Sequence, residues 1–413
     1  MTRFAHRAAT AAQLRIGAIP FVLAIIYVVS AYASAAVATC TESDNIPYGY
    51  AFYFSCVDIL ALITYPISQA LSLFAGFLIG NNLMRRRFKP ILSIRVRGIR
   101  MYSNLAAPVS LILSFGLAAY FIFLAASHDN DNDIENWRAI SSKSSQLLLV
   151  AAGFLTSNNI VRRQFSISAT VLVFVISATV LVADASRSAA LPLGIAAFFC
   201  AMNKRYILAL LFSAPILPVL GLARGAREFM AFGESGFDNL ASIIANTEFF
   251  SLGYLAAYSF VHMMVIQDVA HVSFTISDFL YSVIPLPSGI HFINHELENW
   301  RMDMFRPMSG MSQMLYLGFF PFLLFNIFIG IFFGKARNAS RNRAGILGVL
   351  LLLIFFLSCH QYFLRGAMWF FYFHIIAMMI SASSGTQLPS NDIGSEPAVP
   401  DHGILNNPNH GQN

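Results

Sequence analysis

The chain alternates long apolar runs with short polar segments over most of its 413 residues. An apolar run of about 20 residues is long enough to cross ~30 Å of hydrocarbon as a helix. About ten such runs are predicted to span a membrane: residues 16–39, 57–80, 103–126, 145–161, 165–183, 188–202, 206–223, 313–334, 344–361 and 367–382. The pattern therefore predicts an all-α, polytopic membrane protein.

One long stretch, residues 224–312, interrupts this alternation and is predicted to be a large outer loop that contains short helices. Within it, residues 249–267 are apolar enough to span, but a single added span would invert the sides of all later loops. Either this segment lies on the outer face, which we favour, or it crosses together with residues 272–286 and makes twelve spans. The second alternative brings Asp268, His271 and Asp278 near or into the bilayer.

The predicted organisation follows from these runs. Residues 1–223 hold the first seven spans, 224–312 the loop, and 313–382 the last three spans. Residues 383–413, rich in Ser, Asn, Pro and Gly, have too little apolar surface to fold and are predicted to be a disordered cytoplasmic tail.

Basic residues set the predicted orientation, because Lys and Arg near span ends are retained in the cytoplasm. With both termini cytoplasmic, most of the 26 Lys and Arg residues fall on that side. The net charge of +6 is then explained by topology, so no nucleic-acid partner is expected. The basic start and "ASAAVA" also suit a signal peptide, but the first run is longer than a usual signal core, which favours a retained span.

Composition agrees with this class, since 57% of residues are hydrophobic and 11% are charged. The four cysteines lack metal-ligand spacing. Only Cys40 and Cys56 fall near the same face in this topology, and a disulfide between them is left open.

Several arginines fall at outer span ends. Arg187 lies in the hairpin "LVADASRSAAL", Arg224 and Arg227 lie in "GLARGAREF", and Arg365 begins the last span. An arginine near the membrane needs a partner, and its planar fork suits phosphate oxygens. These residues are candidates for binding a lipid phosphate or diphosphate. For Arg187, pairing with Asp184 or with lipid headgroups is an equally strong structural explanation.

The densest ionisable cluster precedes the eighth span. It contains His291, His295, Glu296, Glu298, Arg301, Asp303 and Arg306. A His or Glu here could act as general base toward a sugar hydroxyl, and Trp300, with the arginines, could bind the glycan. The alternative is an ordinary solvated loop with local salt bridges.

No motif predicts a metal or a nucleotide. "HFINHELEN" does not have the HExxH order of zinc hydrolases. The chain also lacks a Gly-rich phosphate loop and a nucleophile elbow, which argues against an ATP-driven pump or a serine hydrolase.

Three segments together resemble the O-antigen polymerase family, the Wzy-type enzymes. They are "ADASRSAALPL", then "IPLPSGIHFIN" with "SGMSQMLYLGFFPFLLFNIFIG", and finally "LRGAMWFF". The resemblance implies that the chain joins undecaprenyl-diphosphate-linked oligosaccharide units at the periplasmic face of the bacterial inner membrane. It implies no metal or other cofactor, and a chain-length regulator as a partner.

The resemblance also implies roles for the candidate residues. Arg187, Arg224 and Arg227 would hold the diphosphate, with Arg365 completing the site, and His291, His295 or Glu296 would take the acceptor proton. The chain departs from the family where many relatives carry an acidic residue at the start of the eighth span. Here we find Ser312, Gln313 and Tyr316. The paired arginine-to-glycine spacing of some members is also absent, since Ser235 and Asp238 stand at those positions.

Two other functions remain open. An O-antigen ligase shares the layout and the donor, and differs in its acceptor. A flippase or transporter would place ionisable residues along a path through the spans, often with repeat symmetry, yet Asp58 is nearly the only acid well inside a predicted span.

Overall fold

The computed structural model describes residues 18–40, 56–83, 112–113, 115–116, 119–120, 134–163, 166–184, 187–231, 240–246, 250, 274–284, 301–303, 306–307, 309–339, 343–360 and 364–385. Nearly all of this part of the chain is helical, which confirms the all-α class. The exception is a small antiparallel pair of strands, β1 (Arg301–Asp303) and β2 (Arg306–Pro307).

The helices follow the apolar runs of the sequence. In chain order they are α2 (Ile19–Cys40), α3 (Cys56–Ala61), α4 (Thr64–Leu83), α6 (Ile134–Arg162), α7 (Ser166–Asp184), η2 (Arg187–Ala189), α8 (Ala190–Met202), α9 (Tyr206–Ser213), α10 (Ile216–Ala231), α11 (Leu240–Ala245), α13 (Ile276–Val283), α15 (Gly310–Tyr316), α16 (Phe319–Ala339), α17 (Arg343–Ser358) and α18 (Leu364–Gly385).

Among the described residues, five helical segments are long and apolar enough to cross a membrane. They are Ile19–Val37, Cys56–Asn82, Tyr206–Ala226, Phe319–Ala336 and Leu364–Ser381. Shorter apolar helices cover Ser166–Val182, Arg187–Met202 and Ala344–Ser358. The chain is therefore a membrane protein by the length and composition of its helices, but the predicted count of about ten spans is not confirmed. Most of the predicted span at 103–126 lies outside the described residues.

Three predicted spans are interrupted where the sequence pattern is continuous. Turns fall at Leu62 and Ile63 and at Ala214 and Pro215, and Gly318 separates α15 from α16. Pro215 has no N–H to continue the hydrogen bonding of α9. Gly318 has φ +125, which favours glycine, so the span predicted to begin at residue 313 is instead a short helix followed by a long one.

Helices α4 and α16 pack closely through two glycine pairs. Gly76 and Gly80 on α4 lie against α16, and Gly330 and Gly334 on α16 lie against α4. A Cβ at any of the four would lie under 3.0 Å from a backbone carbonyl oxygen of the other helix. Small residues four positions apart let membrane helices approach until their backbones touch, so this spacing sets the α4–α16 contact.

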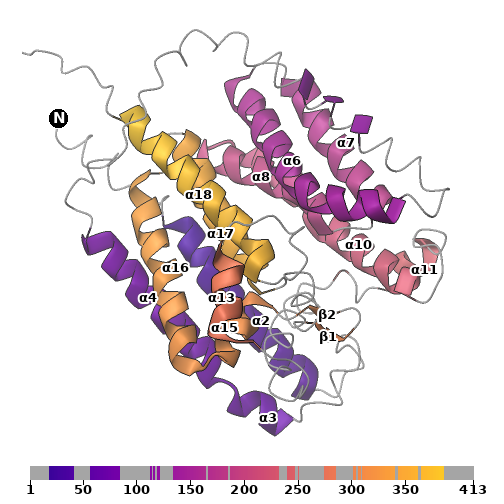
Figure 1. Cartoon of the computed structure of the whole chain (residues 1–413). Coiled ribbons are helices and arrows are strands. Elements are labelled where there is room, and N and C mark those ends of the chain that lie inside the picture. Colours follow the sequence, from indigo (N-terminus) through magenta and orange to yellow (C-terminus); the bar gives the residue numbers. More distant parts are fainter. Residues whose placement is uncertain are drawn as a thin grey trace, which may run out of the picture.

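Helices α6, α7, α8 and α10 form a neighbouring group, drawn in magenta at the upper right of Figure 1. Val150 of α6 and Ile195 and Phe199 of α8 belong to the same buried apolar cluster as α2, α4, α16, α17 and α18, so the two groups share a core. At the far end, Arg205 donates to the carbonyl oxygens of Ile160 and Val161, at 2.7 and 2.9 Å, and caps the last turn of α6.

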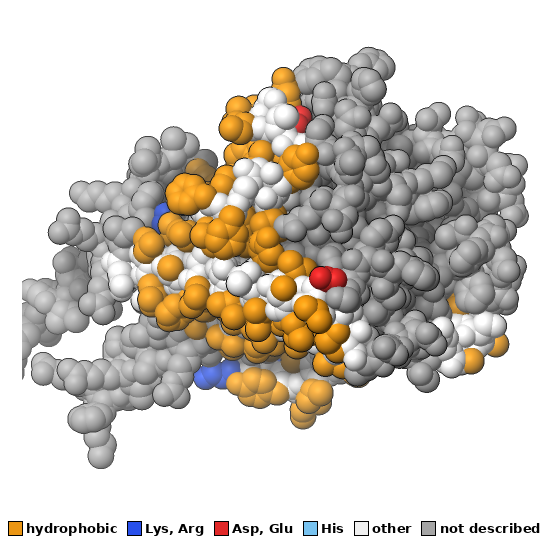
Figure 2. Space-filling view, turned by 90° about the horizontal axis from the view of Figure 1, so that it is seen from below, with side chains coloured by type: hydrophobic (Ala, Val, Ile, Leu, Met, Phe, Trp, Pro, Cys, Tyr) orange, Lys and Arg blue, Asp and Glu red, His pale blue; other side chains and the backbone are white. Residues whose placement is uncertain are grey.

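Most of the short elements lie away from the C-terminal ends of α4 and α18. In Figure 1, α3 lies at the bottom, α13 and α15 lie near the centre beside α16 and α17, and β1, β2 and α11 lie to the right. Hydrophobic side chains cover most of the described surface seen from below in Figure 2, and charged side chains there are few. Side chains such as Leu71 and Ile207, exposed by 63% and 86%, suit contact with lipid.

Candidate functional site

The first turn of α18 is the meeting point of several elements at one end of the bundle. Gln313 of α15 accepts a hydrogen bond at its Oε1 from the backbone N–H of Leu364, at 2.9 Å. Gly310 brings α15 close to the same residue, because a Cβ there would lie 3.1 Å from the Cα of Leu364. Gln313 therefore serves as a cap for a helix that is remote in sequence.

Helix α15 is short but firmly anchored. The hydroxyl of Ser309 caps its first turn by accepting from the N–H of Ser312, at 3.1 Å. The N–H of Met311 donates to the carbonyl oxygen of Cys359, just beyond α17, at 2.8 Å. Ser309, Ser312 and Gln313 are all fully buried, so α15 carries polar groups into the interior.

Arg365, predicted to bind phosphate, lies one residue further along α18. Arg365 is only 9% exposed, and its guanidinium donates to the carbonyl oxygen of Tyr281 on α13, at 2.8 Å. Tyr372 of α18 donates to the carbonyl oxygen of Val283, so α13 is held to α18 at two points. The structure thus places Arg365 where α13 packs on α18.

The buried carboxylate of Asp278 is explained by its role in capping a helix. Thr275 and Asp278 form a capping box at the start of α13, and the Asp278 carboxylate accepts from the backbone N–H of Thr275 at 2.6 Å. Helix α13 has 8 residues. At ~1.5 Å per residue it is too short to cross the hydrocarbon by itself.

A second polar group is buried between helices nearby. Gln69 of α4 donates from Nε2 to Oδ1 of Asn326, at 3.1 Å, and to Nε2 of His360, at 3.2 Å. Nδ1 of His360 lies 2.9 Å from the carbonyl oxygen of Phe356, which can only accept. We therefore assign the ring proton to Nδ1, and the imidazole is neutral.

The predicted diphosphate residues Arg187 and Arg224 lie on elements that pack together. Arg187 begins η2, which contacts α10, and Arg224 lies on α10. The neighbouring residues Ala189 and Ala223 belong to one buried apolar cluster. Arg224 is 2% exposed and Arg187 is partly exposed. The Ser177 hydroxyl donates to the carbonyl oxygen of Ala189, at 2.7 Å, and holds η2 against α7.

The other predicted site residues are not placed. His291, His295, Glu296 and Trp300 lie outside the described residues. For Arg227, Arg301 and Arg306 only the backbone is described: Arg227 lies in α10, and the other two lie in the β1–β2 pair. Their roles remain predictions.

Sequence reasoning gave no role to four buried residues: Gln69, Gln313, Asn326 and His360. Each of these residues is a polar side chain inside or beside an apolar run, which the sequence shows. Polar residues in membrane helices usually serve packing or function. That signal does not reveal partners, because Gln69 and Asn326 are 257 positions apart.

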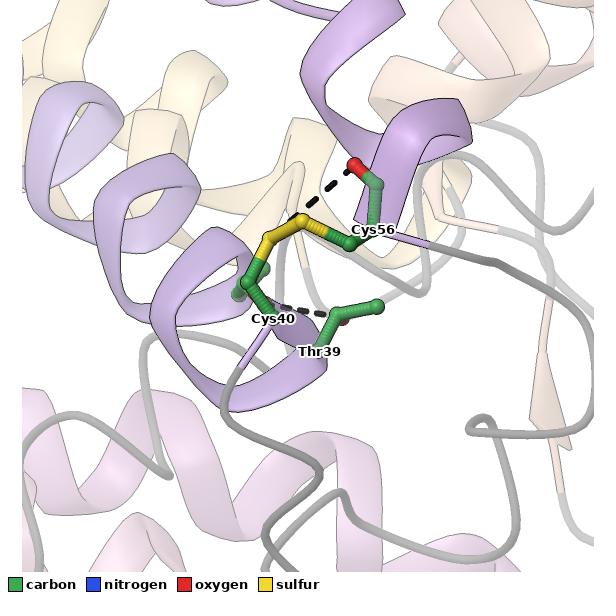
Figure 3. The surroundings of a disulfide bond; sticks show 4 residues. Thr39, Cys40 and Cys56 are labelled. Atoms are coloured by element: carbon green, nitrogen blue, oxygen red, sulfur yellow. Dashed lines mark hydrogen bonds between the residues drawn. A yellow bond between two sulfur atoms is a disulfide. The ribbon is translucent and has the colours of Figure 1, made fainter.

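The disulfide left open by the sequence is present. Cys40, at the end of α2, is bonded to Cys56, at the start of α3 (Figure 3). The last turn of α2 is further held by Thr39, whose hydroxyl donates to the carbonyl oxygen of Ala35 at 2.9 Å. The bond ties the end of α2 to the start of the α3–α4 segment, 16 positions further along the chain.

The chemistry of this end of the bundle is that of hydrogen-bond donors and cations. Buried guanidinium groups, an amide and hydroxyls suit an oxygen-rich anionic ligand. Within the described ranges, no group of three His, Cys, Asp or Glu side chains is arranged to hold a metal ion. Comparison with protein family models, curated proteins and solved structures finds no match to this chain.

Proposed function

We propose that this protein is a membrane glycosyltransferase that joins oligosaccharide units carried on undecaprenyl diphosphate. The reaction would take place at the periplasmic face of the bacterial inner membrane. The proposal draws on the resemblance to O-antigen polymerases in the segments around Arg187, His291 and Arg365. One structural observation supports it most: Arg187 and Arg224 lie on packed elements of a membrane protein, and Arg224 is almost fully buried.

The physical argument concerns the cost of burying charge. A guanidinium removed from water is destabilising unless anionic or hydrogen-bonding groups surround it. Two guanidiniums on adjoining elements would suit a diphosphate, whose negative charge grows as the glycosidic bond breaks. In this proposal Arg187, Arg224 and Arg227 stabilise the leaving diphosphate, and Arg365 contributes from α18.

The acceptor half of the reaction rests on the sequence. His291, His295 or Glu296 would remove the proton of the acceptor hydroxyl, and Trp300, Arg301 and Arg306 would bind the glycan. Balanced chemistry then needs only the two lipid-linked glycans: the acceptor oxygen bonds to the sugar carbon as the carbon–diphosphate bond breaks.

Deleting the gene tests the proposal in a host whose surface glycan gives a ladder on a gel. Polymerase function predicts that the ladder is lost while single repeat units remain attached to the lipid A core. Loss of all attachment would instead identify a ligase, which uses the same donor. Accumulation of units on the inner leaflet would identify a flippase, and an unchanged ladder would refute all three.

Arg224 provides the sharper test. Replacing it with Gln removes the charge, and we expect transfer to fall on the order of a hundredfold, whereas Arg224→Lys should retain partial activity. Arg162→Gln is the matched control, because Arg162 is exposed at the last turn of α6. Membrane abundance is measured for each variant. Full ladders from an abundant Arg224→Gln protein would contradict the role.

A further inference from the structure

The amide of Gln313 is oriented by its surroundings. Its Oε1 faces the N–H of Leu364, and a backbone N–H can only donate, so the NH₂ group cannot occupy that position. Nε2 is fixed on the other side of the amide, beside the first turn of α18. Among the residues that the structure describes, this nitrogen has no hydrogen-bond partner, although Gln313 is 0% exposed.

A buried hydrogen-bond donor without an acceptor destabilises the folded protein, so an unsatisfied donor marks a position where a ligand can supply the acceptor. Ser282 of α13 repeats the observation: it is 1% exposed, and within the described part of the chain its hydroxyl finds no hydrogen-bond partner. Ser282 follows Tyr281, whose carbonyl oxygen binds Arg365. Both unsatisfied groups thus belong to elements that contact Leu364 and Arg365, the first two residues of α18.

The electrostatics of this place favour an anion. Helix α18 has 22 residues, and its N-terminus presents backbone N–H groups and the positive end of the helix dipole. The Arg365 guanidinium adds a full positive charge at the same turn. Gly366 in the same turn is exposed, and among the described residues no atom of another element lies within 4 Å of the position that its Cβ would take.

The position of the site along the membrane-spanning helix indicates which anion binds there. Leu364 begins both α18 and the apolar segment Leu364–Ser381. The start of a membrane span lies at the headgroup layer, where the phosphates of lipids are the abundant anions. Phosphate oxygens also match guanidinium and backbone N–H donors in geometry and charge.

We infer that the first turn of α18, with Gln313, Ser282 and Arg365, binds the phosphate group of a lipid. Gln313 is a positioning residue for α18 through Oε1 and a ligand-binding residue through Nε2. The phosphate could belong to a membrane phospholipid or to a lipid diphosphate. The inference does not require glycan transfer and is tested by binding alone.

The key variant is Gln313→Glu. Glutamate has the same size and keeps an oxygen for the N–H of Leu364, but it replaces the NH₂ donor by a carboxylate oxygen that repels phosphate. Ser282→Ala removes the second donor without adding charge. Arg162→Gln, which changes an exposed cation at the last turn of α6, is the control.

Binding is measured on the purified full chain in detergent, by native mass spectrometry and by ligand-induced shifts in Tm. The probes are dihexanoyl phosphatidic acid and farnesyl diphosphate, with farnesol as the phosphate-free control. We expect the chain to bind at least one phosphate probe and not farnesol. Affinity should fall at least about tenfold in Gln313→Glu and less in Ser282→Ala, and stay unchanged in Arg162→Gln.

The two probes separate the sources of the phosphate. Binding of phosphatidic acid alone supports a bound membrane phospholipid, and binding of farnesyl diphosphate alone supports a carrier-lipid site; binding of both supports the shared phosphate chemistry. Failure to bind either probe overturns the inference. So does wild-type affinity in a Gln313→Glu protein with a native size-exclusion profile, because an internal water would then account for the buried amide. Failure of the proposed glycan transfer would leave these results unaffected.

Discussion

At the scale of single residues, the interior of this protein is specified by isolated polar side chains in apolar surroundings. The side-chain amide of Gln69 donates two hydrogen bonds, one to Asn326 and one to His360. Each of those partners is anchored on a backbone carbonyl of its own helix, Asn326 on Phe322 and His360 on Phe356. The group therefore fixes α4, α16 and the end of α17 in one relative register.

Gln69→Leu should destabilise the protein by about 1–2 kcal/mol, because it leaves Oδ1 of Asn326 and Nε2 of His360 buried without that donor. Thermal unfolding in detergent measures the effect as a lower Tm. Ser68→Ala is the matched control, since Ser68 is the preceding residue and its hydroxyl donates to the carbonyl oxygen of Thr64 in its own helix. Equal Tm values for the two variants would show that the buried group adds nothing to stability.

At the scale of elements, glycines decide which helices pair. The four glycines of α4 and α16 place the two backbones in contact. By contrast, within the described part of the chain no other element comes within 4 Å of the Cβ position of Gly194 in α8. Both kinds of glycine look alike in sequence, as one small residue in an apolar helix. Only the glycines at the interface are required by geometry.

Gly330→Ala should therefore be destabilising by about 1–3 kcal/mol, since its Cβ would collide with the carbonyl oxygen of Leu73 and backbone atoms cannot move aside cheaply. Gly194→Ala should be neutral or stabilising by up to about 1 kcal/mol, because alanine is the better helix former. Thermal unfolding of both variants side by side checks the contrast. The explanation fails if the two substitutions have the same sign and size.

At the scale of the whole molecule, long-range contacts join helix ends that the predicted topology assigns to the same side. The Cys40–Cys56 disulfide and the Gln313–Leu364 bond lie at predicted outer ends. The bond from Arg205 to Ile160 lies at a predicted inner end. These three contacts agree with the sides that the predicted topology assigns to the helix ends they join. Which end faces the cytoplasm is a prediction from charge alone.

The disulfide offers a direct test of orientation, because such bonds persist in oxidising compartments. In spheroplasts, a membrane-impermeant phosphine followed by an impermeant maleimide polymer should label Cys40 and Cys56, and omission of the phosphine should prevent labelling. A Cys40→Ser, Cys56→Ser double variant should remain unlabelled, since Cys200 and Cys359 are buried. Labelling that requires lysis would place this end in the cytoplasm and invert the topology.

The apolar runs were enough to predict a membrane protein and the course of most helices, because burial in hydrocarbon demands long apolar runs with internally bonded backbones. Each predicted span overlaps a helix, apart from 103–126, most of which lies outside the described residues. The positions of the arginines at the ends of spans were also evident from the sequence. The breaks before Thr64 and at Gly318 were not, because hydropathy does not register a local turn.

Which polar residues meet depends on how the helices pack in three dimensions. The hydrogen-bond partners of Gln69, Gln313 and Arg365 lie between 51 and 291 positions away along the chain. Apolar periodicity carries no information about such pairs, since a helix can bury a given face against any neighbour. The contact between η2, which begins at Arg187, and α10, which carries Arg224, follows from how the helices pack and not from the order of residues along any one of them. The same holds for the unsatisfied amide of Gln313 beside α18.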